Sequence, residues 1–197
     1  DPAGVPSELS GTVFTFKYND FIGLEDIVSK HDIGVIKMEV QRSVPPEKGF
    51  LENVRALASK NNIVLIFDEC TSGFRQTFGG LHKIYGVEPD MAMFGKALGN
   101  GYAITAVIGR KEVMSAAQNT FISSTFWTER IGPAAALATL KIMEENQSWK
   151  TITDIGVYIR QKMQQLFIQT GLPGEQWGLP SLTGYTIKAD MTRYTAC

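Results

Sequence analysis

Two kinds of hydrophobic pattern alternate along the chain. Apolar residues that alternate with polar ones or form short continuous runs, both typical of strands, occupy residues 12–17, 35–40, 63–67, 91–94, 103–108 and 121–125. Apolar residues at three- and four-residue spacing, which indicate helices, occupy residues 21–31, 50–61, 131–145 and 152–169. Strand and helix patterns that follow one another in this way predict an α/β protein with a mostly parallel sheet and three αβα layers.

The run at residues 63–67, IVLIF, is continuously apolar, as in a strand that is covered on both faces by helices. Asp68 and Glu69 follow it directly. In open α/β sheets ligands bind at the carboxyl ends of the strands, so we expect a site here. Successive strand residues face opposite ways, so Asp68 and Glu69 are poor candidates for a paired acid–base site.

Composition and charge exclude several classes of protein. The 197 residues carry 19 basic and 20 acidic side chains, a net charge of -1 that favours neither nucleic acid nor an anionic membrane. No apolar run approaches the roughly 18 residues of a membrane span, and the first residues do not resemble a signal peptide. Cys70 and Cys197 are far apart and form no CxxC pair. We expect a soluble, cytoplasmic protein.

Lys96 lies in the glycine-flanked segment FGKALGNGYA. The segment is not a phosphate loop of the Walker type, because Ala97 stands where serine or threonine is required. It is not a dinucleotide-binding fingerprint either, because the third glycine is missing. The hydroxyl-rich segment Ser123-Ser124-Thr125 is a further candidate.

The same residues also allow simpler structural interpretations. Asp68 can cap the next element or pair with a base such as Arg75, and Lys96 can be a surface lysine beside a flexible turn. The only histidines, His31 and His82, have no second ligand at metal-binding spacing, so no metal site is expected. We expect His82 to be a surface or helix residue.

Read together, three segments resemble one family: IVLIFDECTSGFR, GLHKIYGVEPDMAMFGKALGNGYAITAVIGR and FISSTFWTERIGPAAALATLKIME. They resemble the class III aminotransferases, which depend on pyridoxal 5′-phosphate (PLP), and most closely the branch similar to glutamate-1-semialdehyde aminomutase. The resemblance runs from about residue 35 to residue 144. It implies the large domain of the PLP-dependent transferases (fold type I), with its second half at residues 1–150. A linking helix and the start of a small C-terminal domain would occupy residues 151–197.

The resemblance also implies roles for individual residues. Lys96 would form an imine with the cofactor aldehyde and, once displaced by a substrate amine, act as the base. Asp68 would keep the ring nitrogen protonated, which makes the ring a better electron sink. Cys70, where many relatives carry valine, would pack on the ring, and Thr71 would lie near the ring hydroxyl.

Thr125 matches a threonine that reaches the cofactor phosphate of a neighbouring subunit, so the resemblance implies a homodimer. The Gly-Asn-Pro that usually follows is replaced here by Phe126-Trp127-Thr128-Glu129. Family members are longer than this chain and bind most of the phosphate with a loop that is not evident in it. The sequence is therefore consistent with two functions. One is a PLP-dependent transaminase or aminomutase acting on small-molecule amino donors and acceptors; the alternative is a non-catalytic fragment or interaction module derived from such an enzyme.

Overall fold

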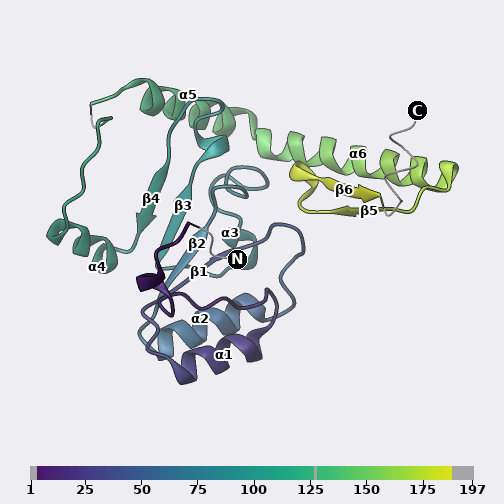
Figure 1. Ribbon diagram of the computed structural model, residues 1–197. Coiled ribbons are helices and arrows are strands. Elements are labelled where there is room, and N and C mark those ends of the chain that lie inside the picture. The colour runs from purple at the N-terminus through teal and green to yellow at the C-terminus, as the bar shows by residue number, and fades with distance from the viewer. Residues whose placement is uncertain (1–3, 127, 188–197) are drawn as a thin grey trace.

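The structure is a computed structural model that describes residues 4–126 and 128–187. Its main sheet has the order β1-β2-β3-β4 (Figure 1). The strands are β1 (Val35–Glu39), β2 (Val64–Asp68), β3 (Met91–Phe94) and β4 (Ala106–Gly109). The first three pair in parallel and β4 runs antiparallel to β3. The expectation of an α/β protein with a mostly parallel sheet is confirmed.

The helices of the described residues lie before, between and after these strands. They are α1 (Phe21–Lys30), α2 (Phe50–Lys60), α3 (His82–Tyr85), α4 (Lys111–Met114), α5 (Ile131–Asn146) and α6 (Ser148–Thr170), with 3-10 turns at Ser7–Leu9, Lys96–Leu98, Ser115–Asn119 and Pro180–Leu182. Figure 1 shows α6 leading away from the main sheet, with the antiparallel pair β5 (Gly174–Trp177) and β6 (Gly184–Ile187) alongside it. None of these helices is long and apolar enough to cross a membrane.

Local signals set the starts of the first two long helices. The side chain of Asp20 accepts a hydrogen bond from the backbone N–H of Gly23 at 2.9 Å, which satisfies a free donor at the start of α1. Gly49 precedes α2 with a φ of 83°, a left-handed conformation that glycine adopts without steric cost.

Two of the predicted strands are wrong. Residues 12–17 and 121–125 contain no strand, although their apolar residues suggested one. In the first segment the ring of Phe14 stacks on that of His31 with centroids 3.9 Å apart, so its apolar side chain packs beside α1 without any ladder to a neighbouring strand. In the second segment Phe121 is 95% exposed. A strand requires a hydrogen-bonded neighbour, which side-chain patterns alone do not reveal.

The main core lies between α2 and one face of β1 and β2. Buried residues on that face of the strands are Ile36, Met38, Leu65 and Phe67, and they pack with Leu51, Val54, Leu57 and Ala58 of α2. Burying one such large side chain contributes about 1.5–3 kcal/mol. The opposite face carries Lys37, Glu39 and Asp68, with Glu39 and Asp68 directly opposite each other in the register. One face of the sheet thus stabilises the fold and the other presents charged groups.

A second, smaller cluster fixes α5 at the end of β3. Phe94 of β3 and Leu98 of the following turn are buried against Ala136 of α5, with Leu140 packed beside them. This contact holds the backbone around residues 94–98, and therefore the start of the segment that carries Lys96.

Candidate active site at the carboxyl ends of β2 and β3

Asp68 is the last residue of β2, and both of its carboxylate oxygens have hydrogen-bond donors. Oδ2 lies 2.7 Å from Nζ of Lys37, and Oδ1 accepts from the backbone N–H of Cys70 at 3.1 Å. Burial acts to raise the pKa of the Asp68 carboxyl, but the hydrogen bonds from Lys37 and Cys70 outweigh it, so this pKa lies below its ordinary value. The pairing with Arg75 considered above is wrong, because Nε of Arg75 donates to the carbonyl of Thr71.

Lys96 follows β3 and opens the 3-10 turn Lys96–Leu98. Its backbone has a φ of 45°, which is unusual for a residue with a Cβ and costs conformational energy. The backbone N–H groups of Gly99 and Asn100 both donate to the Lys96 carbonyl at 3.2 Å, which closes the turn around this residue. The ammonium donates to Oγ1 of Thr71 at 2.6 Å. No acidic side chain forms an ion pair with Lys96 within residues 4–126 and 128–187.

Cys70 lies between Asp68 and the segment that carries Lys96. A Cβ placed on Gly95 would lie 3.6 Å from its Sγ, so the thiol packs against the backbone just before Lys96. Burial and the hydrogen bond with Asp68 raise the pKa of the Cys70 thiol, which favours its neutral form. The fold thus brings together four of the predicted site residues: Asp68, Cys70, Thr71 and Lys96.

The fifth predicted residue, Thr125, is exposed and forms no hydrogen bond with these four among the described residues. Its neighbours Ser124 and Phe126 line a cavity of about 740 Å³ together with Thr105 and Glu129. Trp127, which belongs to the sequence that replaces the usual Gly-Asn-Pro, lies outside the described residues.

Glu69, one residue after Asp68, faces the opposite way and is fully buried, as strand geometry predicts. Its Oε1 accepts from the backbone N–H of His82 at 3.0 Å and lies 2.8 Å from Nδ1 of the same residue, while the Ser72 hydroxyl donates to Oε2. Burial acts to raise the pKa of Glu69, but hydrogen bonds from His82 and Ser72 outweigh it and lower this pKa. His82 lies in the short helix α3, as expected of a helix residue, but its side chain is buried and not at the surface.

Gly80 permits the close packing around this carboxylate. A Cβ at Gly80 would lie 2.8 Å from Oε1 of Glu69 and 2.3 Å from Cε1 of His82, so no larger residue fits without displacing the pair. The Glu69 network therefore ties the end of β2 to α3 and fixes the loop that carries Cys70 and Thr71.

Beside Lys96 is an open cavity of about 650 Å³, lined also by Arg75, Asn100, Tyr102 and Thr105. Arg75 is half-buried, and burial lowers the pKa of its guanidinium. This cavity gives the Lys96 amine access to a small molecule from outside the sheet.

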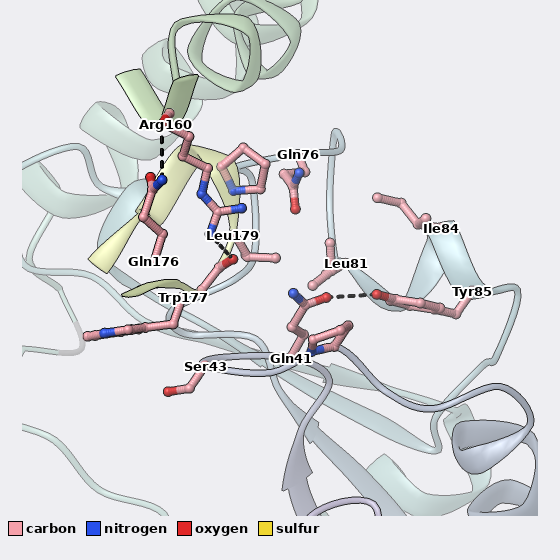
Figure 2. A pocket seen from close by; sticks show the side chains of 13 residues that line it. Gln41, Ser43, Gln76, Leu81, Ile84, Tyr85, Arg160, Gln176, Trp177 and Leu179 are labelled. Carbon is pink, nitrogen blue, oxygen red and sulfur yellow. Dashed lines mark hydrogen bonds between the residues drawn. The ribbon is translucent and has the colours of Figure 1, made fainter. Parts of the chain in front are cut away.

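A separate cavity of about 450 Å³ lies where α6 and the residues after β5 meet the segment after β1 (Figure 2). Within it the Tyr85 hydroxyl donates to Oε1 of Gln41 at 2.7 Å, and Nη2 of Arg160 donates to the carbonyl of Gly178 at 2.8 Å. None of the predicted site residues lines this cavity. The candidate chemistry thus lies at the strand ends and not in the cleft beside α6.

Sequence reasoning missed Lys37. The sequence did contain a signal: a lysine interrupts the apolar strand at residues 35–40 and lies on the same face of the strand as Glu39, two residues later. It was not found because nothing in the sequence states which strand lies next to β1 or in what register.

Comparison with known proteins places these residues in context. The family model for aminotransferase class-III matches residues 20–183. The chain is 36% identical to the 3-aminobutyryl-CoA aminotransferase of Cloacimonas acidaminovorans over 95% of this chain and 47% of that protein. It is 33% identical to the glutamate-1-semialdehyde 2,1-aminomutase of Citrifermentans bemidjiense over 88% of this chain and 43% of that protein. The chain thus spans about half the length of the curated relatives it matches.

Solved structures show the same fold. The FumI protein of Sphingopyxis sp. MTA144, solved in a form that carries PLP, matches with a TM-score of 0.89 and 26% identity over 95% of this chain and 47% of that one. An omega-transaminase from Sphaerobacter thermophilus matches with a TM-score of 0.82 and 25% identity over 98% of this chain and 47% of that one. The expected fold of the PLP-dependent transferases is confirmed.

Proposed function

The chain belongs to the class III aminotransferases, and from this premise we propose that it provides the lysine and aspartate of the cofactor site in a PLP-dependent transaminase or aminomutase. The observation that carries the proposal is the arrangement at the ends of β2 and β3, where an ionised carboxylate ends one strand and a lysine amine follows the neighbouring one. Because the chain spans about half the length of its relatives, the activity, substrates and partners of the whole protein are part of this proposal.

The described residues fit PLP. Asp68 offers an anion for a protonated ring nitrogen, Lys96 an amine for an aldehyde, and Thr71 a hydroxyl that contacts this amine. Cys70 is a small, mostly neutral side chain on which a flat ring can pack. When bound, PLP supplies an aldehyde that amines attach to and a ring that withdraws electrons from the substrate carbon.

Asp68 enters the reaction as a fixed negative charge. Its carboxylate stays ionised at neutral pH, because hydrogen bonds lower its pKa, and it is held at the strand end by the Cys70 backbone. A charge that needs no rearrangement during the reaction stabilises positive charge on the ring nitrogen more effectively than water does.

Lys96 would hold the cofactor through its amine and would serve as a base once a substrate amine has replaced it. Its amine is held by the Thr71 hydroxyl at 2.6 Å, and its backbone is fixed by the turn. Thr71 therefore orients the nitrogen that would move a proton at the substrate carbon. The cavity of about 650 Å³ beside Lys96 suits small amino donors and acceptors.

We also infer that the functional state is a cytoplasmic homodimer. The support is the resemblance of the segment around Thr125 to one that reaches a neighbouring subunit's cofactor phosphate, and the exposure of Thr125 in a single chain.

The test is covalent attachment of PLP to the purified chain. We expect borohydride reduction after PLP addition to give an adduct that peptide mapping locates on Lys96, and Lys96→Ala to lose it. The exposed Lys48→Ala variant is the matched control and should keep the adduct. Labelling spread over surface lysines, or none, would instead support the alternative of a non-catalytic fragment or interaction module.

A further inference from the structure

The Asp68 carboxylate has a cationic partner that comes from the neighbouring strand. Lys37 lies in β1 opposite Ile66, and its side chain runs toward the carboxyl end of the sheet to reach Asp68. The distance from Nζ to Oδ2 is 2.7 Å. Because the Cys70 backbone already donates to Oδ1, each carboxylate oxygen has one donor before any ligand arrives.

Lys37 forms its ion pair with Asp68 and not with the other acidic residue on this face of the sheet. Glu39, which is nearest to Asp68 in the register, forms its ion pair with Arg42 at 3.3 Å. The side chain of Asp68 is 22% exposed and that of Lys37 51%, so the carboxylate is the more sheltered partner. Asp68 is therefore paired with a lysine side chain that is about half exposed to water.

Few other titratable groups influence this pair. From β1 these are Lys37 and Glu39; from the end of β2 they are Asp68 and Cys70; and the positive charge of Lys96 also acts on Cys70. Lys37 is thus the cation that contacts Asp68, and Lys96 acts on the neighbouring Cys70. A second positive charge at Asp68 must compete with Lys37 for Oδ2.

We propose that Lys37 is a positioning residue of the cofactor site. It holds the Asp68 carboxylate through Oδ2 and weakens the electrostatic attraction between that carboxylate and a cationic ring nitrogen. The inference rests on the function proposed above. At separations of roughly 6 Å and an effective dielectric of about 40, one like charge shifts a pKa by about one unit. Lys37 would therefore make the ring nitrogen easier to deprotonate than Asp68 alone would.

The first experiment uses the chain without cofactor. The ¹³C resonance of the Asp68 carboxyl is titrated in the unaltered chain, in Lys37→Met and in Lys37→Arg. We expect the pKa of Asp68 to rise toward its ordinary value of 3.8 in Lys37→Met and to stay low in Lys37→Arg, which keeps the charge. Lys30→Met removes an equally short ion pair, with Asp26 at 2.7 Å in α1, and should leave Asp68 unchanged. An unchanged Asp68 titration in Lys37→Met overturns the proposal.

The second experiment adds pyridoxamine 5′-phosphate labelled with ¹⁵N in the ring, which binds without an imine. We expect the pKa of the ring nitrogen to rise by about one unit in Lys37→Met and to be kept in Lys37→Arg. A ring nitrogen whose pKa falls or does not move in Lys37→Met contradicts the competition. If no variant binds the labelled compound, the proposed function fails for this chain, and the carboxyl titration still decides whether Lys37 holds Asp68.

Discussion

The two carboxylates at the end of β2 are adjacent in sequence and have opposite environments. Glu69 is fully buried and hydrogen-bonded to Ser72 and His82, all of which lie within 13 residues of one another. Asp68 faces the other side of the sheet, is partly exposed, and has its ion pair with Lys37, 31 residues earlier. One carboxylate is enclosed by the fold and the other is presented at its edge.

This difference separates structural from chemical use of the same functional group. A buried carboxylate is costly unless its hydrogen bonds are satisfied, so the Glu69 network holds a loop in one conformation. A partly exposed carboxylate can exchange its partner, so Asp68 can bind a ligand. Changes at Glu69 should affect stability, and changes at Asp68 should affect binding.

The largest expected effect is on stability at Glu69. Glu69→Ala leaves the His82 backbone N–H and the Ser72 hydroxyl buried without an acceptor, and we expect a loss of about 3–5 kcal/mol in the free energy of unfolding. Denaturant unfolding measures it. Glu25→Ala, at an exposed position of α1, should change stability by no more than about 0.5 kcal/mol. A similar small loss in both variants would mean that the enclosed carboxylate does not hold the loop.

The next effect is on binding at Asp68. Asp68→Asn should change the free energy of unfolding by less than about 1 kcal/mol, because the Lys37 side chain of its ion pair is about half exposed to water. It should weaken binding of pyridoxamine 5′-phosphate about 30-fold, since a charge-assisted hydrogen bond of roughly 2 kcal/mol is lost. Calorimetric titration at pH 7 measures the affinity. If stability falls and affinity does not, Asp68 has a structural role and not a binding role.

The smallest effect is a pH dependence of stability. The pKa of Glu69 is lowered in the folded chain, so its contribution is present above its ordinary pKa of 4.5 and is lost as pH falls through the lowered value. Glu69→Gln, which cannot titrate, should lose less stability than the unaltered chain between pH 6 and pH 3. Parallel acid titrations of unfolding in the two chains test the sign.

Prediction from sequence succeeded where a pattern is local. Eight of the ten predicted strands and helices are present, among them IVLIF at β2 and the long helices α5 and α6, since amphipathic spacing and continuous apolar runs reflect burial directly. It failed at residues 12–17 and 121–125, because an apolar run forms a strand only if another strand offers hydrogen bonds. The segment after β1 also contributes Gln41 to the cleft beside α6, which no motif indicated (Figure 2).

For the site, the sequence by itself determined which groups are present and where on the strands they occur: a carboxylate directly after a buried strand, a lysine in a glycine-flanked turn, and a resemblance that links them. The tertiary structure decided their partners. That Lys37 and not Arg75 holds Asp68, and that Glu69 turns inward to His82, follow from the register of β1 on β2 and the path of the loop. Such contacts depend on the relative placement of segments that local side-chain preferences do not encode, which is why only the folded chain reveals them.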